Sequence, residues 1–139
     1  VCSPAMVNRL GGMPEPQDVL RLGLLHLSDH EDWGQWFSSV GLDPGLAATG
    51  VVFSDMHLVY SAALAGQGIA MGDVILSEDA MSSGQLVRPF EQEVRSPKAY
   101  FMAVPHARVD KPAVEAFRSW LRSERAQSFS LPKMQSANR

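Results

Sequence analysis

A chain of 139 residues with 45% apolar and 19% charged residues has the length and composition of a globular domain with one hydrophobic core. Its formal net charge is −3 and its Lys and Arg residues are scattered, which argues against the basic stripe that binding to a nucleic-acid backbone requires. The single cysteine, Cys2, excludes an intrachain disulfide and favours the reducing cytoplasm, and no apolar run approaches the roughly 20 residues of a membrane span. We therefore expect no DNA binding by this segment and no membrane partner.

The first part of the chain predicts two short helices and a strand. Ser3 and Pro4 are typical of a helix start, which predicts a helix over residues 4–10. A second short helix is expected after Pro16. Residues 24–27 form a short, mostly apolar run that predicts a strand.

An aromatic stripe marks the next helix. Trp33, Trp36, Phe37 and Val40 are spaced i, i+3, i+4 and i+7, and Gly41 follows them, so the spacing predicts a helix with one aromatic face. We interpret this face as core, because large aromatic residues at helical spacing are first of all a packing surface.

The central stretch predicts a βαβ unit. The β-branched run at residues 51–53 is followed by the N-cap residues Ser54 and Asp55, by a helix over residues 56–65, and by a second apolar run at residues 69–71. The free N–H groups at the helix start lie at the carboxyl end of a strand, where open α/β sheets bind their ligands. The helix start is therefore a candidate binding site.

Two helices and two strands are expected toward the C-terminus. They are a helix over residues 74–81, an edge strand over residues 86–90, a strand over residues 99–104 and a helix over residues 112–122. The polar tail from residue 126 is expected to be extended unless a neighbour orders it.

Four sequence phrases point to one family. They are F-S-D-x-x-L from Phe53, A-A-L-A-G-Q-G-I-A-x-G from Ala62, G-Q-L-V-R-P-F from Gly84 and A-Y-F from Ala99. Together they resemble the effector-binding domain of LysR-type transcriptional regulators, in the branch of the glycine-cleavage and β-lactamase regulators, over residues 1–124. The resemblance implies a periplasmic-binding-protein-like α/β fold of two lobes, with a small-molecule effector in the cleft between them.

The resemblance also divides the chain. Residues 1–104 correspond to the second lobe with both crossover segments, residues 105–125 to the return segment and C-terminal helix of the first lobe, and residues 126–139 to a tail. The winged helix-turn-helix and most of the first lobe would lie upstream. Contact with DNA is therefore expected only through that N-terminal domain.

On this resemblance, the effector site lies at strand ends that face the cleft. The candidate residues are Ser54, Asp55 and Met56 at the helix start, Tyr100 on the return strand, and His26 and Ser28. The alternative is that Ser54 and Asp55 only cap the helix and Tyr100 fills a gap. Asp55 adds a carboxylate, which disfavours an anionic effector through like-charge repulsion.

Catalysis and metal binding fit the sequence less well. Ser54, Asp55 and His57 have the residue types of a hydrolytic triad, but at a helix start they point to different sides, and no G-x-S-x-G motif surrounds the serine. The histidines, including His26 and His30, form no H-x-x-x-H pair on a helix and have no Cys partner. We interpret them as surface residues and expect no catalytic residue, metal or cofactor.

Three classes of function remain open. The first is the sensory domain of a transcription regulator, the second is a solute receptor of the periplasmic binding type, and the third is a small α/β enzyme. A helix-turn-helix upstream would favour the first class, and a signal peptide would favour the second.

Two apolar surfaces predict self-association. The helix over residues 56–65 has only His57 and Ser61 as clearly polar residues, so we expect it to be covered on most sides. The C-terminal helix carries an apolar face formed by Val114, Phe117, Trp120 and Leu121. We expect a homodimer in which the C-terminal helix docks on a partner or is exchanged with it.

Overall fold

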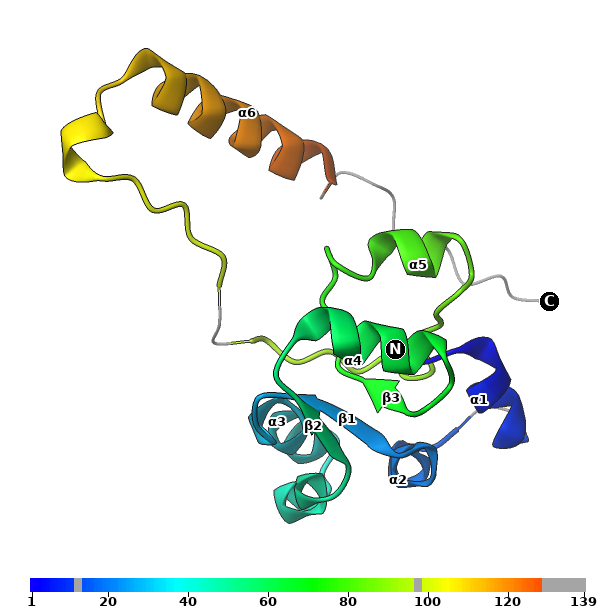
Figure 1. Cartoon of the computed structure of the whole chain (residues 1–139). Coiled ribbons are helices and arrows are strands. Elements are labelled where there is room, and N and C mark those ends of the chain that lie inside the picture. Colours follow the sequence, from blue (N-terminus) through cyan, green and yellow to red (C-terminus); the bar gives the residue numbers. More distant parts are fainter. Residues whose placement is uncertain (12–13, 97–98, 129–139) are drawn as a thin grey trace. The chain divides into compact units, whose positions relative to one another are not determined.

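The computed structural model describes residues 1–11, 14–96 and 99–128 (Figure 1). Its helices, 3-10 helices (η) and strands are α1 (Pro4–Arg9), η1 (Pro16–Asp18), α2 (Val19–Leu22), β1 (Leu24–Leu27), α3 (Glu31–Ser39), η2 (Pro44–Ala48), β2 (Val51–Phe53), α4 (Met56–Leu64), β3 (Ile69–Ala70), α5 (Glu78–Ser82), η3 (His106–Arg108) and α6 (Pro112–Ser128). Internal contacts divide the chain into two units, Val1–Pro97 and Lys98–Arg139.

The first unit is built on a three-stranded parallel sheet in the order β2-β1-β3. The register places Leu25 of the central strand opposite Val51 on one side and opposite Ala70 on the other. α4 connects β2 to β3 and so crosses over β1. The predicted βαβ unit is confirmed, with the strand predicted over residues 24–27 lying between its two strands.

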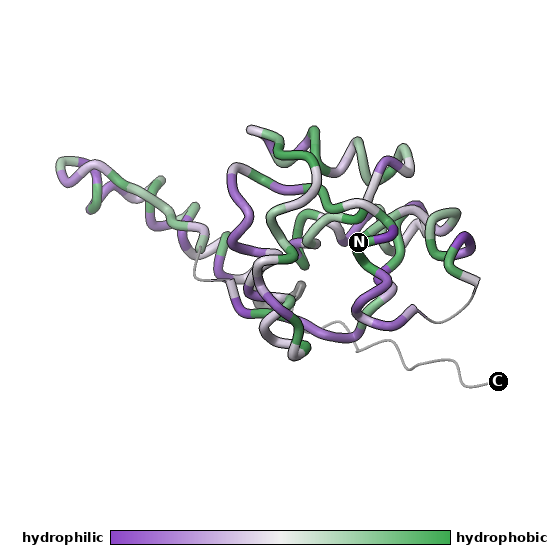
Figure 2. Tube along the Cα trace, turned by 90° about the horizontal axis from the view of Figure 1, so that it is seen from below, coloured by the Kyte–Doolittle hydropathy of each residue, from purple (hydrophilic) through white to green (hydrophobic). Residues whose placement is uncertain are grey.

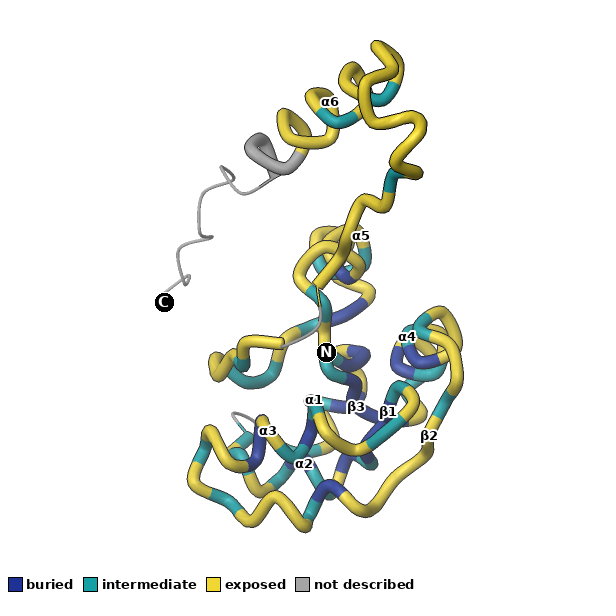
Figure 3. Tube along the Cα trace, turned by 90° about the vertical axis from the view of Figure 1, so that its left-hand side faces the viewer, coloured by how far each residue is buried: buried dark blue, intermediate teal, exposed yellow. Residues whose placement is uncertain are grey.

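Helices cover both faces of this sheet (Figure 1). α4 lies on one face, where Val59 and Ala63 pack with Leu25. α3 lies on the other face, where Phe37 belongs to a core that includes Leu24. Successive strand residues point to opposite faces, so the two leucines of β1 serve two separate cores. Figure 3 shows the buried residues gathered along the strands and the helix sides that face them.

The aromatic face of α3 is part of the core, as predicted. Trp33, Trp36 and Phe37 are all buried, and the rings of Trp33 and Trp36 meet edge to face with centroids 5.6 Å apart. The indole N–H of Trp33 donates a hydrogen bond of 3.0 Å to the carbonyl oxygen of Leu25. A buried indole needs such a partner, and this one fixes α3 to the central strand.

Two glycines allow the outer strands to approach β1. A Cβ atom at Gly68, just before β3, would lie 2.6 Å from the carbonyl oxygen of Gly23. Gly50, just before β2, has a φ of +112°, and a Cβ atom there would overlap the carbonyl oxygen of Leu24. Neither position has room for a side chain.

The segment after β3 differs from the helix predicted over residues 74–81. The Asp73 carboxylate accepts hydrogen bonds from the N–H groups of Ile75 at 2.9 Å and Leu76 at 3.1 Å. This arrangement is an Asx turn, in which an aspartate binds N–H groups two and three residues further on. Residues 74–77 therefore form a turn, and α5 is confined to Glu78–Ser82.

The edge strand predicted over residues 86–90 is reduced to a single antiparallel bridge between Val87 and Cys2. The two residues exchange both backbone hydrogen bonds, at 3.1 and 2.8 Å. The bridge ends there because α1 begins at Pro4, which has no N–H to continue a ladder.

The second unit contains η3 and α6. The strand predicted over residues 99–104 is wrong, since these residues have no regular secondary structure. An apolar run becomes a strand only when another strand pairs with its backbone, and the described residues of this unit include none. α6 extends to Ser128, so the first residues of the predicted tail are helical, and the rest of that tail lies outside the described residues.

Apolar side chains remain at the surface of α6. Phe117, Trp120 and Leu121 of the predicted apolar face are exposed, and Val114 is half-buried. Figure 2 shows hydrophobic and hydrophilic residues interleaved along the chain. In the part of the chain that the structure describes, no helix is both long and apolar enough to cross a membrane.

Candidate functional site

The ends of β1 and β2 are joined at one edge of the sheet. Ser28 follows β1, and its N–H donates a hydrogen bond of 2.8 Å to the carbonyl oxygen of Phe53, the last residue of β2. Ser28 has a φ of 66°, in the left-handed region that residues with side chains seldom occupy. Because Ser54 follows Phe53, the two serines lie where the carboxyl ends of parallel strands meet, which is where such sheets bind ligands.

The start of α4 lies at the same edge. Asp55 is the N-cap residue, and its Oδ1 accepts a hydrogen bond of 2.7 Å from the N–H of His57. The predicted capping role therefore belongs to Asp55, and Ser54 precedes it. Both side chains are exposed, whereas Met56 is half-buried.

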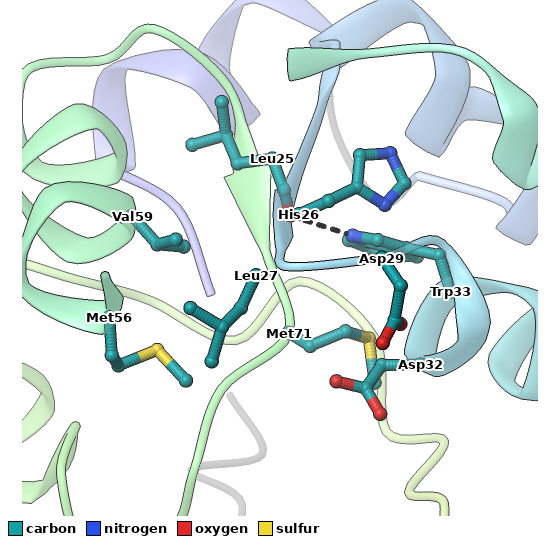
Figure 4. Close-up of a pocket in the computed structure, with 9 residues that line it drawn as sticks. All are labelled: Leu25, His26, Leu27, Asp29, Asp32, Trp33, Met56, Val59 and Met71. Carbon is teal, nitrogen blue, oxygen red and sulfur yellow. Dashed lines mark hydrogen bonds between the residues drawn. The ribbon is translucent and has the colours of Figure 1, made fainter. Parts of the chain in front are cut away.

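A small cavity lies below this edge, between the strands and helices α3 and α4 (Figure 4). It is lined by Leu25, His26, Leu27, Asp29, Asp32, Trp33, Met56, Val59 and Met71. Its volume of about 20 Å³ leaves room for about one water molecule. The cavity itself can therefore take at most one small group of a ligand that lies across this edge.

Only His26 and Met56 of this lining belong to the predicted site, and the residues missing from it include Asp29, Asp32 and Met71. Figure 4 shows the carboxylates of Asp29 and Asp32 on the side of the cavity where Met71 lies. Asp29 also accepts a hydrogen bond of 2.9 Å from the N–H of Glu31 at the start of α3. The signal for Asp29 and Met71 was their place just after β1 and β3, because the carboxyl ends of parallel strands lie at one edge.

His26 is not the surface residue that the sequence suggested. It is 2% exposed, and its Nε2–H donates a hydrogen bond of 2.7 Å to the carbonyl oxygen of Thr49. Burial lowers the pKa of His26 below its ordinary value of 6.5, and the Thr49 carbonyl opposes this shift only in part. Its alternation with Leu24 along β1 was the missed signal, since both point to the α3 face. Figure 4 shows its ring directed away from Met56 and Val59.

Tyr100 belongs to the second unit, where it is 72% exposed. Ser28, Ser54, Asp55 and Met56 are brought to one edge of the first unit, with His26 behind that edge. The structure thus groups the predicted site residues of the first unit at one edge, and Tyr100 belongs to the second unit.

This edge offers hydrogen-bond acceptors and negative charge. The carboxylate of Asp55 accepts a hydrogen bond from the backbone N–H of His57 and so caps the helix. Among the described residues, no group of three or more His, Cys, Asp or Glu side chains could hold a metal ion. With Asp29, Asp32 and Asp55 around it, the edge favours a neutral or cationic polar molecule over an anion.

Curated proteins with related sequences are transcriptional regulators. A family model described as the LysR substrate binding domain matches residues 1–126. The glycine cleavage system transcriptional activator of Escherichia coli K12 is 28% identical over 126 residues, which are 91% of this chain and 41% of that protein. The HTH-type transcriptional activator AmpR of Providencia stuartii is 29% identical over 89% of this chain and 41% of its own length.

Solved structures of the same kind share the fold. The effector domain of the transcriptional regulator AmpR of Pseudomonas aeruginosa superposes with a TM-score of 0.76 and 27% identity, covering 91% of this chain and 60% of that one. The AmpR effector-binding domain of Citrobacter freundii gives 0.73 and 25%, covering 91% and 62%.

These matches confirm both the predicted periplasmic-binding-protein-like α/β fold and the resemblance read from the sequence phrases. The chain belongs to the LysR substrate-binding domain family. It spans about two fifths of the length of the curated relatives, 41% in the case of the Escherichia coli activator.

Proposed function

We propose that this chain is the effector-sensing part of a longer LysR-type transcriptional regulator that acts in the cytoplasm. The family match over residues 1–126 supports the sensing role, and the 41% share of the relatives supports a longer protein. The net charge of −3 supports DNA contact through another domain, the winged helix-turn-helix. A periplasmic receptor and an enzyme remain without a supporting observation, and the named relatives are regulators.

We propose that residues 1–104 form the second lobe with both crossovers, and that residues 105–125 form the return segment and C-terminal helix of the first lobe. The division of the chain between Pro97 and Lys98 supports a boundary in this region. The antiparallel bridge of Cys2 with Val87 supports a crossover role for the first residues of the chain.

We propose that a small-molecule effector binds across the joined strand ends. The observation that carries this proposal is the hydrogen bond from the Ser28 N–H to Phe53, because it brings both serines and the start of α4 to one edge. The effector contacts on the first unit are assigned to Ser28, Ser54, Asp55 and Met56, with His26 supporting the edge from behind. Tyr100 is proposed separately, as an effector-contacting residue of the second unit. The carboxylates at the edge disfavour an anionic effector.

The experiment is an NMR titration of the 139-residue chain with three probes: methylammonium, glycine and acetate. We expect methylammonium or glycine to shift the amide resonances of Ser28, Ser54 and Asp55, and acetate to shift them less. Ser54→Ala should weaken the response, whereas Ser61→Ala, an exposed serine on the same helix, should leave it unchanged. Shifts that cluster away from this edge, or a stronger response to acetate, would count against the proposal.

We also propose that the regulator is a homodimer. The exposed apolar residues Leu58 and Leu64 of α4, with Val51 and Val52 of β2, support a partner surface on the first unit, and the exposed face of α6 supports a second one. The sequence predicted that α4 is covered on most sides. Its own sheet covers the side that carries Val59 and Ala63.

A further inference from the structure

A groove lies between α1 and the end of α4 (Figure 1). Its lining includes Ser3, Met6 and Arg9 on one side and Leu64, Ala65 and Gly66 on the other. It is open to solvent and has a volume of about 570 Å³, which is within the range of small-molecule sites. The candidate effector site lies at the start of α4, about 13 Å away along this nine-residue helix. The groove is therefore a separate place on the first unit.

The hydroxyl of Ser3 is a buried polar group without a partner. Ser3 is 8% exposed, and within residues 1–11, 14–96 and 99–128 its Oγ has no hydrogen-bond partner. A Cβ atom added at Gly66 would lie 3.3 Å from this Oγ, so the hydroxyl faces a residue that lines the same groove. Leaving a buried hydroxyl unpaired is unfavourable, and a bound molecule that supplies the partner removes this penalty.

The hydroxyl does not cap α1, although Ser3 is the N-cap residue of that helix. A serine in this position usually accepts a hydrogen bond from an N–H group of the first turn. Here the N–H of Met6 binds the backbone carbonyl oxygen of Ser3 at 3.0 Å, and the side chain forms no capping bond. The backbone is fixed on both sides, by the bridge of Cys2 with Val87 and by the ring of Pro4. The Ser3 side chain thus has no part in the helix and is available to a ligand.

The groove carries a positive charge. Arg9 is exposed in the last turn of α1, no Asp or Glu lines the groove, and no described carboxylate forms an ion pair with Arg9. At the end of α4, the carbonyls of Ala62 and Ala63 accept hydrogen bonds from Gln67 and Gly66, which reduces the negative charge that a helix end presents. The groove therefore favours an anion, whereas the aspartates at the candidate effector site disfavour one.

Apolar side chains supply the rest of the lining. Met6 is buried, Leu64 is 42% exposed, and Pro4 is exposed beside them. Apolar lining of this kind holds the hydrocarbon part of a small molecule, and a few polar groups fix its orientation. A molecule that satisfies both parts of the groove has an apolar body and one negative charge.

We propose that this groove is a second small-molecule site, which binds an organic carboxylate with an apolar body. The carboxylate accepts a hydrogen bond from the Ser3 hydroxyl and is attracted by the Arg9 guanidinium. The apolar body lies against Met6 and Leu64. This site does not depend on the proposed effector site, which lies at the other end of α4 and favours the opposite charge.

The test is an NMR titration of the 139-residue chain at pH 7 with hexanoate. Hexylammonium has the same body with the opposite charge, and acetate has the charge without the body. We expect hexanoate to shift the amide resonances of Arg9, Ala65 and Gly84 in a saturable way and to leave Ser54 unchanged. Hexylammonium and acetate should bind there at least about tenfold more weakly. Light scattering at the same protein concentration checks that the mass stays constant during the titration.

Equal binding of hexylammonium at the groove would overturn the proposal, because the charge would then have no effect. Hexanoate shifts that do not saturate at millimolar concentration, or that cluster at the effector site, would also overturn it. Methylammonium shifts at Ser54 are independent of either result, so the two proposed sites fail or stand separately.

Two variants test the assigned contacts. Arg9→Gln should weaken hexanoate binding by about tenfold, whereas Arg21→Gln, an exposed arginine that pairs with Asp18, should leave it unchanged. Ser3→Ala should weaken binding severalfold without lowering the free energy of unfolding in urea, because the hydroxyl caps nothing. Unchanged hexanoate affinity in Arg9→Gln, or in a folded Ser3→Ala chain, would refute the site. Because Arg9 is exposed, its variant tests the charge even if Ser3→Ala does not fold.

Discussion

The two faces of the parallel sheet are covered to different degrees. On the α3 face, Phe37 is 0% exposed, and Trp33 and Trp36 are buried beside it. On the α4 face, Val59 and Ala63 are buried, yet Leu58 is 52% and Leu64 is 42% exposed. The chain buries the apolar side chains of the α3 face by itself, and it leaves large apolar side chains of α4 exposed on the other face. Stability and assembly are therefore expected to depend on different helices.

The largest effect is expected on the α3 face. Phe37→Ala removes a fully buried ring and should lower the free energy of unfolding by about 3–5 kcal/mol, measured by urea denaturation. Leu58→Ala is the matched change on the other face, and for the monomer its cost should stay within about 0.5 kcal/mol. If the two substitutions lowered the free energy of unfolding equally, the side chains of both faces would be buried to the same degree.

The next effect concerns the α4 face and the proposed dimer. Leu58→Ser should weaken dimerisation by about 10- to 100-fold in Kd, because a buried leucine contributes about 1.5–3 kcal/mol. Light scattering coupled to size exclusion measures the mass over a range of concentrations. The comparison variant is Phe117→Ser with Leu121→Ser on α6. If only this double change dissociates the dimer, the partner surface lies on α6.

A smaller effect is expected from the cap of α4. Asp55→Ala removes the acceptor of the His57 N–H and should cost about 1 kcal/mol in the free energy of unfolding. Asp55→Asn keeps an acceptor oxygen and should restore most of that loss. Stability equal to that of the wild type in Asp55→Ala would mean that the residue is kept for ligand contact rather than for capping.

The pH dependence of stability should report on the α3 face of the sheet, because the side chain of His26 lies on that face. The pKa of His26 is lowered in the folded state. Just below pH 6.5 the unfolded chain therefore binds a proton at this histidine that the folded chain does not bind. The contribution of His26 is therefore complete above pH 6.5 and is lost progressively as the pH falls toward the folded-state pKa. Urea denaturation at a series of pH values should show a shallower decline in His26→Gln, and an unchanged slope would contradict this assignment.

The elements that the sequence predicted well are those whose local pattern is sufficient. The spacing of Trp33, Trp36 and Phe37 defines one helix face whatever lies opposite it, and Asp55 marks a helix start by its own hydrogen bond. Strands β1 and β2 end at residues 27 and 53, and both ends follow from short apolar runs bounded by polar residues. These features require no knowledge of the distant chain.

The two strand predictions that failed depend on partners far along the chain, whereas the failed helix start depends on a neighbouring side chain. Val87 can pair with Cys2 only for the one residue before α1 begins, and residues 99–104 have no strand beside them within the described part of their unit. The turn at residues 74–77 depends on one carboxylate, Asp73, which competes with the helix for the same N–H groups. The hydrogen-bond partner of the buried His26 is the carbonyl of Thr49, which is distant in sequence and which no local pattern indicates.

The three tryptophans lie in two different environments, so their fluorescence can report on two parts of the chain. Trp33 and Trp36 are buried in the first unit, whereas Trp120 is 53% exposed in the second. An indole in an apolar core fluoresces at shorter wavelength than one in water, so the emission spectrum contains separate contributions from the sheet core and from α6. With Trp120→Phe, the remaining emission reports on the α3 face alone. Trp33 would then sense changes close to His26, since its indole binds the carbonyl of Leu25, the residue before that histidine.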